Sequence, residues 1–169
     1  MQTKADEDAL RQSLANYVAA WNARDVDRIA ALFAEDGRYG EFGEGRVLSG
    51  RDQIAEHLRA LISVIQDLRL AVSAPPFCAV DRVFFKWIMR GSIGRGVAVR
   101  VGAAGAFELH GATVLVFAGG KISRAADSFD AGSAHALAST DVAWLSDGSL
   151  LARAPETEEP PEDNICYGE

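Results

Sequence analysis

The sequence has little of several features that define large classes of protein. Its 169 residues include only two cysteines, Cys78 and Cys166, which are too few for a disulfide framework and have no neighbour at metal-ligand spacing. No apolar run approaches the roughly 20 residues that a bilayer-spanning helix needs. The N-terminal residues lack the basic and apolar regions of a secretory signal. We therefore expect a soluble, cytoplasmic protein with no membrane partner and with two thiols that do no chemistry.

Basic residues are also scarce, with 17 Lys and Arg against 24 Asp and Glu and a net charge of −7. Residues 155–169 contain six of the acids, two adjacent prolines and no basic residue, which is typical of a mobile acidic tail. Without that segment, the acidic and basic residues nearly balance, and no basic cluster stands out. The charge pattern therefore predicts no nucleic-acid partner.

Apolar residues, at 49% of the chain, are sufficient for one well-formed core, and their spacing predicts its elements. Residues 6–21 and 51–65 repeat apolar side chains every three or four positions, which indicates amphipathic helices. Between them, Asp25 is a suitable N-cap for a short second helix whose buried stripe ends at Phe33. A short extended piece, residues 37–42, precedes the third helix.

Beyond Asp67 the apolar period changes to two, and turns that contain glycine separate the runs. The predicted strands cover residues 68–72, 82–90, 97–101, 107–117 and 121–129. Helices followed by strands predict an α+β domain over residues 1–138, with three N-terminal helices on a curved, mostly antiparallel sheet and a C-terminal extension over 139–169. Such a sheet encloses an apolar pocket, and its candidate lining residues are Trp21, Phe42, Trp87 and Phe107, which alternatively only fill the core.

Three stretches of sequence are similar to one known superfamily. Residues 17–36 (YVAAWNARDVDRIAALFAED) and 49–55 (SGRDQIA) resemble the helices of ketosteroid isomerases, and Gly120-Lys121-Ile122 followed by residues 127–130 (DSFD) resembles the closing strand of SnoaL-like polyketide cyclases. Both belong to the nuclear-transport-factor-2-like superfamily. The resemblance implies a cone-shaped barrel, acid/base chemistry without a cofactor, a hydrophobic small-molecule substrate and a homodimer.

The resemblance also implies roles for three residues. Tyr17 matches a tyrosine that donates a hydrogen bond to the substrate carbonyl, where negative charge develops as a neighbouring proton is removed. Glu41 falls on the isomerases' catalytic aspartate, and Asp127 falls on the cyclases' acid/base aspartate. The alternatives are a core tyrosine, a solvated loop acid and, if its strand face points outward, an ordinary surface aspartate.

Two further residues that these families use are replaced in this sequence. The isomerases' second oxyanion acid falls at Ala112 and the cyclases' pocket histidine at Thr113, so His110 is the candidate for a shifted donor or base. His57 and His135 have no metal-ligand pairing, which predicts no metal site. The glycine-rich stretch 91–105 lies between strands and indicates a hairpin loop rather than a phosphate cradle.

These features predict an isomerase or cyclase of small-molecule biosynthesis that acts on a hydrophobic, polyketide- or steroid-like carbonyl compound. Two alternatives stay open at this point. One is an epoxide hydrolase or epoxide-opening cyclase, which would need a second carboxylate and an arginine on an earlier strand. The other is a ligand-binding or dimerisation module without catalysis.

Overall fold

A computed structural model describes residues 3–41, 47–93, 105–129, 142–144 and 150–152, and three helices form its N-terminal part. These helices are α1 (Lys4–Ala23), α2 (Val26–Leu32) and α3 (Arg51–Val64). Asp25 caps α2, because its carboxylate accepts a 2.9 Å hydrogen bond from the Arg28 backbone N–H. Arg24 caps the C-terminal end of helix α1, and its left-handed conformation (φ 56°) reverses the chain toward α2.

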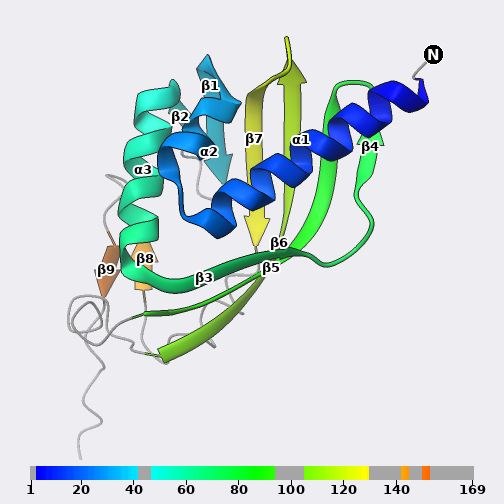
Figure 1. Ribbon diagram of the computed structural model, residues 1–169. Coiled ribbons are helices and arrows are strands. Elements are labelled where there is room, and N and C mark those ends of the chain that lie inside the picture. Colours follow the sequence, from blue (N-terminus) through cyan, green and yellow to red (C-terminus); the bar gives the residue numbers. More distant parts are fainter. Residues whose placement is uncertain (1–2, 42–46, 94–104, 130–141, 145–149, 153–169) are drawn as a thin grey trace, which may run out of the picture.

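The strands form one seven-stranded mixed sheet that does not close into a barrel (Figure 1). Its spatial order is β2-β1-β7-β6-β5-β3, and β4 pairs with the free end of β5. All pairings are antiparallel except β1 with β7. The strands are β1 (Phe33–Glu41), β2 (Val47–Ser49), β3 (Ile65–Val72), β4 (Phe77–Ala79), β5 (Arg82–Ile93), β6 (Gly105–Ala118) and β7 (Lys121–Phe129), while β8 (Val142–Trp144) and β9 (Leu150–Ala152) form a separate hairpin.

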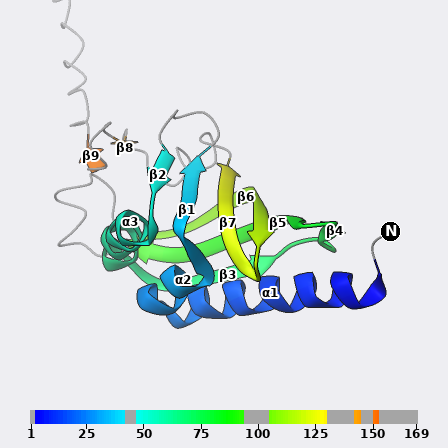
Figure 2. The same ribbon diagram turned by 90° about the horizontal axis from the view of Figure 1, so that it is seen from above.

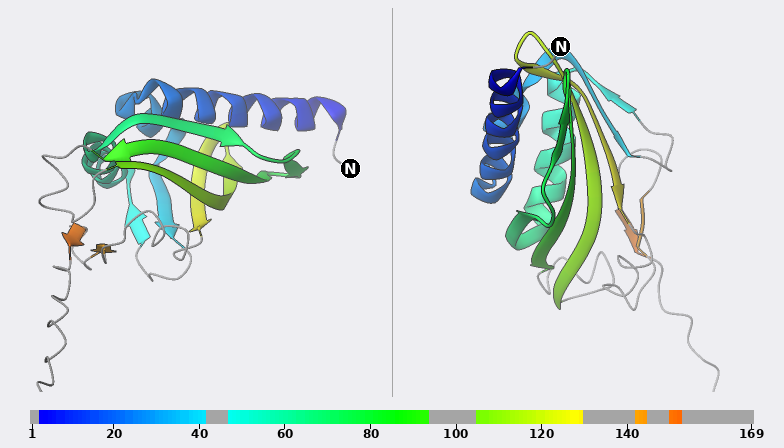
Figure 3. Two further views of the ribbon diagram at one scale, coloured as in Figure 1. Left: turned by 90° about the horizontal axis from the view of Figure 1, so that it is seen from below. Right: turned by 90° about the vertical axis from the view of Figure 1, so that its right-hand side faces the viewer.

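The sheet is curved, and the helices lie on one side of it (Figures 2 and 3). We call the covered side the inner face and the opposite side the outer face. Alternation along β5 separates the two, because Val83, Phe85 and Trp87 are buried on the inner face while Phe84 and Lys86 are exposed on the outer face. The core therefore lies between the inner face and the helices.

Side chains tie the helices to specific backbone groups of the sheet. The Asn22 amide bonds both ways with the Leu70 backbone, donating to its carbonyl at 2.9 Å and accepting from its N–H at 2.7 Å. Arg51 donates to the Phe33 carbonyl at 2.8 Å, which joins the start of α3 to the start of β1. These bonds satisfy buried backbone groups and fix the helices over the inner face.

The structure confirms the predicted α+β class, the three helices and the predicted strands within the described residues. One boundary differs: Phe33 begins β1 instead of ending the second helix, since its carbonyl and side chain are fixed by α3 and the core. The predicted strand 97–101, the domain end at 138 and the acidic segment 155–169 lie outside the described residues. Cys78 is a half-buried free thiol on β4. No helix in the described part of the chain is long and apolar enough to cross a membrane.

Candidate active site

The inner face carries a buried carboxylate, Asp127, near the end of β7. Its side chain is only 8% exposed, although most buried residues of this face are apolar. The Tyr39 hydroxyl on β1 donates a 2.6 Å hydrogen bond to Oδ2, and the Thr113 hydroxyl on β6 donates a 2.6 Å hydrogen bond to Oδ1. Asp127 thus sits between two strands that each supply a hydroxyl donor.

Thr113 is itself held by a second buried group. The Trp87 indole Nε1–H on β5 donates a 2.8 Å hydrogen bond to Thr113 Oγ1. Thr113 and Trp87 are 2% and 5% exposed, so the chain of bonds from Trp87 to Asp127 is shielded from solvent. Hydrogen bonds in such an environment are strong, and each polar group in the chain has a partner.

Burial governs the protonation of Asp127. Removal from water raises the pKa of its carboxyl above the ordinary value, and the hydrogen bonds from Thr113 and Tyr39 oppose that rise without cancelling it. A carboxyl of this kind holds a proton at higher pH than a surface aspartate does. Its carboxylate is therefore a stronger base than that of a surface aspartate.

Tyr17 approaches the same region from α1. Its ring is 2% exposed and packs edge-on against Trp21 and Phe85, with centroid distances of 6.2 Å in both pairs. Burial and then the charge of Asp127 raise the pKa of the Tyr17 hydroxyl well above its ordinary value, so it stays a hydrogen-bond donor. The Trp21 indole lies close enough to the Tyr17 hydroxyl to act in the opposite direction on that pKa, but its buried Nε1 makes no hydrogen bond of adequate geometry to any described residue.

The other predicted site residues fall in different places. Glu41, the last residue of β1, is the register partner of Asp127 in the parallel β1–β7 pair, which places their backbones side by side. The side chain of Glu41 and all of Phe42 lie outside the described part of the structure. Phe107 is half-buried on β6, next to Gly91.

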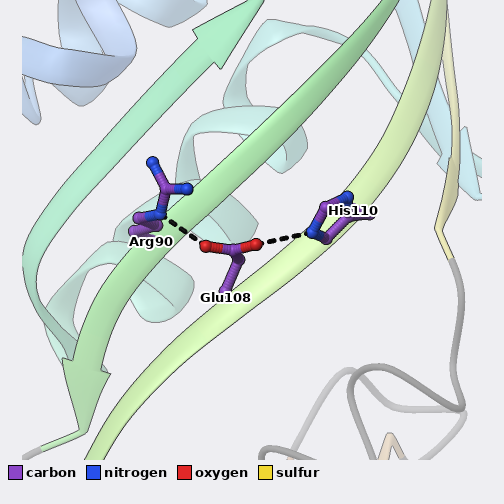
Figure 4. Close-up of polar contacts among 3 residues, drawn as sticks. All are labelled: Arg90, Glu108 and His110. Atoms are coloured by element: carbon purple, nitrogen blue, oxygen red, sulfur yellow. Dashed lines mark hydrogen bonds and ion pairs between the residues drawn. The ribbon is translucent and has the colours of Figure 1, made fainter. Parts of the chain in front are cut away.

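His110 is not brought to Asp127. It lies on the outer face of β6, because Thr113 points inward and three positions separate the two residues along a strand of period two. Its Nε2 is 2.7 Å from Glu108, which also accepts a 2.6 Å hydrogen bond from Arg90 (Figure 4). The shifted-donor role predicted for His110 therefore has no support from its position.

Two residues of the site were missed by sequence reasoning, Tyr39 and Thr113. Alternation in the piece 37–42 puts Tyr39 on the same strand face as Glu41, which was the available signal. Thr113 was noticed only as a position where a family histidine is absent. In the structure, the Thr113 hydroxyl lies beside Asp127 and donates a hydrogen bond to its carboxylate. Within the described residues, no cluster of three or more His, Cys, Asp or Glu is placed to hold a metal ion.

Comparison with known proteins bears on this site and its fold. A search of curated proteins finds no match. Among solved structures, a protein from Catenulispora acidiphila with a ketosteroid isomerase-like fold, crystallised with trimethylamine, is 24% identical; the match covers 76% of this chain and 92% of that one with a TM-score of 0.65. A candidate polyketide cyclase from Xanthomonas campestris is 19% identical, with coverage of 77% and 96% and a TM-score of 0.66.

A third solved structure, a phenazine biosynthesis-related protein from Pseudomonas aeruginosa, is 21% identical, with coverage of 82% and 90% and a TM-score of 0.65. At these identities the likeness shows the fold and not the activity. The profile of the SnoaL-like domain matches residues 14–125, which is more than half of the chain and stops just before Asp127. With helices, sheet and matched residues in agreement, the chain belongs to the family of SnoaL-like domains.

Proposed function

We propose that this protein is an acid/base enzyme that acts on a hydrophobic carbonyl compound, as an isomerase or cyclase of small-molecule biosynthesis. The observation that carries the proposal is Asp127, a carboxyl buried on the inner face, with a raised pKa and with a charge that acts on the buried Tyr17 hydroxyl. A buried acid of this kind is costly to stability, and such groups are concentrated at functional sites. The family and the solved structures support the same general class.

In the proposed reaction, the Asp127 carboxylate removes a proton from a carbon next to the substrate carbonyl. The electrons of the C–H bond form an enolate, whose oxygen takes the developing negative charge. Tyr17 is the expected donor to that oxygen, and the unpartnered Trp21 N–H is available as a second donor. Return of the proton to a different carbon completes an isomerisation. Attack of the enolate carbon on a second carbonyl of the same molecule, followed by protonation of the new alkoxide, completes a ring closure.

Glu41 is the proposed second carboxylate. Its backbone is paired in register with Asp127, so one carboxyl could remove a proton while the other returns one. Epoxide opening has less support, because the buried inner-face residues of β5 are Val83, Phe85, Trp87 and Met89, with no carboxylate among them.

The proposal is tested by isotope exchange. A panel of hydrophobic ketones is incubated with the protein in deuterated water, and loss of the proton signal next to the carbonyl is followed by NMR. We expect exchange with the wild-type chain and a loss of at least about a hundredfold in Asp127→Asn, which cannot act as a base. Glu108→Gln is the matched control, since it neutralises a carboxyl on the outer face.

A panel that shows no exchange with the wild-type protein, while one of its ketones binds, would instead favour a binding module without catalysis. Equal exchange in the wild type and in Asp127→Asn would remove Asp127 from the mechanism.

We also propose that the chain forms a homodimer through the outer face. Phe77, Phe84, Val114 and Ala126 lie in one cross-strand row on β4, β5, β6 and β7. Phe77 and Phe84 are 68% and 42% exposed, which is unusual for large apolar side chains on adjacent strands. Light scattering after size-exclusion chromatography should give a dimer for the wild type and a monomer for Phe84→Lys. A wild-type monomer would contradict this proposal.

A further inference from the structure

The two oxygens of Asp127 have different surroundings, and we propose that this difference decides which oxygen carries the proton. Trp87 and Thr113 act as positioning residues that keep Oδ1 as a hydrogen-bond acceptor. Oδ2, which faces the Tyr39 hydroxyl, is then the oxygen that gains and loses the proton. The catalytic meaning of this assignment rests on the proposed function, but the arrangement can be tested without a substrate.

The assignment of Oδ1 follows from the donor and acceptor capacity of each group. An indole N–H can only donate, so Thr113 Oγ1 must accept the 2.8 Å bond from Trp87. The single proton of the Thr113 hydroxyl is then directed to Asp127 Oδ1, 2.6 Å away. A proton on Oδ1 would turn the acceptor of this bond into a hydroxyl oxygen, which accepts more weakly than a carboxylate or carbonyl oxygen, so protonation at Oδ1 would weaken the bond from Thr113.

The assignment of Oδ2 follows from the different freedom of Tyr39. A phenol can donate to an ionised carboxylate or accept from a protonated one. The 2.6 Å contact between the Tyr39 hydroxyl and Oδ2 can therefore persist in both protonation states, with the donor and acceptor exchanged. The ring of Tyr39 packs against that of His57 on α3, with the centroids 5.9 Å apart.

The backbone of β6 makes room for the Trp87 side chain. Trp87 is the register partner of Gly111, and Phe85 is the register partner of Thr113, so the indole must cross β6 diagonally to reach the Thr113 hydroxyl. A Cβ atom at position 111 would lie 2.2 to 2.6 Å from three atoms of the indole ring. Glycine at this position is therefore required for the hydrogen bond that fixes Thr113.

Among the described residues, ionisable side chains from three elements lie around Asp127. The Tyr39 hydroxyl on β1 bonds to it, Tyr17 on α1 is affected by its charge, and His57 on α3 packs against the Tyr39 ring. Thr113 on β6 and Trp87 on β5 contribute no charge in either state. Their effect on Asp127 therefore acts through hydrogen bonding alone, which makes it separable by mutation.

The experiment measures the proton affinity of Asp127 from the pH dependence of its carboxyl carbon signal in ¹³C-labelled protein. In Thr113→Val the ionised carboxylate loses a donor, so we expect proton binding to tighten by about tenfold. Thr113→Ser keeps the hydroxyl and should restore the wild-type value. Trp87→Phe, which removes the indole N–H together with one ring of the indole, should shift the affinity in the same direction by less.

The decisive measurement is the double variant. Because Trp87 acts through the Thr113 hydroxyl, Trp87→Phe should have no further effect on Asp127 in the Thr113→Val background. Gly111→Ala should reproduce the Trp87→Phe shift by displacing the indole. Gly91→Ala is its matched control, because a Cβ there would also crowd its neighbours, 2.6 Å from Ile65, but away from Asp127.

An unchanged affinity in Thr113→Val, or additive effects of the two substitutions, would overturn the proposal. If Thr113→Val does not fold, Trp87→Phe and Gly111→Ala must each still tighten proton binding by Asp127. An unchanged affinity in both of these variants would also overturn the proposal. Non-additive effects of the Trp87 and Thr113 substitutions on the proton affinity of Asp127 would support the positioning role. If the wild-type protein then catalysed no ketone exchange, the proposed function would be rejected and the positioning role would stand.

Discussion

Asp127 and Glu108 are carboxylates on adjacent strands of one sheet, and they occupy opposite faces. Each has two close polar contacts: Asp127 accepts from Tyr39 and Thr113 at 2.6 Å, and Glu108 lies 2.6 Å from Arg90 and 2.7 Å from His110. Yet burial raises the pKa of Asp127, whereas the bonds from His110 and Arg90 lower the pKa of Glu108. The number of hydrogen bonds is the same, but Asp127 is buried with two neutral donors, whereas Glu108 is exposed beside a guanidinium and an imidazole, and these differences set the opposite directions.

Apolar residues that are neighbours in the sequence also differ in burial between the two faces. Phe85 is 1% exposed and packs against Tyr17, while Phe84, the preceding residue of β5, is 42% exposed on the outer face. One residue of displacement along a strand therefore moves a side chain from the core to the surface. The inner face combines dense packing with one costly acid, and the outer face combines charge with an apolar row.

The largest expected effect tests the difference in side-chain packing between the inner and outer faces. Phe85→Ala should lower the free energy of unfolding by about 3–5 kcal/mol, because it leaves a cavity beneath α1. Phe84→Ala should lower it by less than about 1 kcal/mol. Urea denaturation followed by tryptophan fluorescence measures both. Equal losses would contradict the separation of the faces, and a loss at Phe84 that grows with protein concentration would point to the proposed dimer.

A second expected effect tests the opposite directions of the two carboxyl pKa values. Since the folded chain binds the Asp127 proton more tightly than the unfolded chain does, this group lowers stability as pH rises from its unfolded-state pKa through its folded-state pKa. Relative to wild type, Asp127→Asn should therefore gain stability as pH rises.

Glu108→Gln should show the reverse trend in the same pH series. The pKa of Glu108 is lowered in the folded chain, so its contribution to stability is present above the unfolded-state pKa and is lost as pH falls through the folded-state value. Relative to wild type, Glu108→Gln should lose stability as pH rises. Denaturation curves at several pH values compare the variants, and parallel trends in both would show that burial does not separate the two acids.

The smallest expected effect concerns the ion pairs of the outer face. Arg90 and Glu108 have side chains that are 59% and 43% exposed, so solvent screens their attraction. Arg90→Gln should change the free energy of unfolding by no more than about 0.5 kcal/mol, and 1 M salt should reduce the difference further. Denaturation at low and high salt measures this effect. A loss of several kcal/mol would show that the outer face is covered rather than free.

Much of the fold could be predicted from the sequence, because local spacing specifies it. The helices around Tyr17 and Ile54 follow from apolar residues every three or four positions, and Asp25 caps α2 as its residue type suggests. Alternation along β7 correctly placed Asp127 on the face of Ala125. The start of β1 at Phe33 was missed, since long-range contacts with α3 end the preceding helix.

The site was harder to predict than the fold. Asp127 was found by resemblance, but Tyr39 and Thr113 became part of the site only through strand register, which pairs β7 with β1 on one side and β6 on the other. His110, the candidate for a shifted donor or base, lies on the outer face. The sequence around a lone tyrosine or threonine in a strand does not indicate which residue its hydroxyl will bind.

The sequence by itself therefore determined the α+β class with its amphipathic helices and alternating strands, and a short set of candidate acids, because these features depend on the spacing of neighbouring residues. The tertiary structure alone decided which hydroxyls bind Asp127 and that Gly111 makes room for the indole that orients Thr113. Those relations join residues up to 88 positions apart. They depend on register and burial, which only the packed sheet supplies.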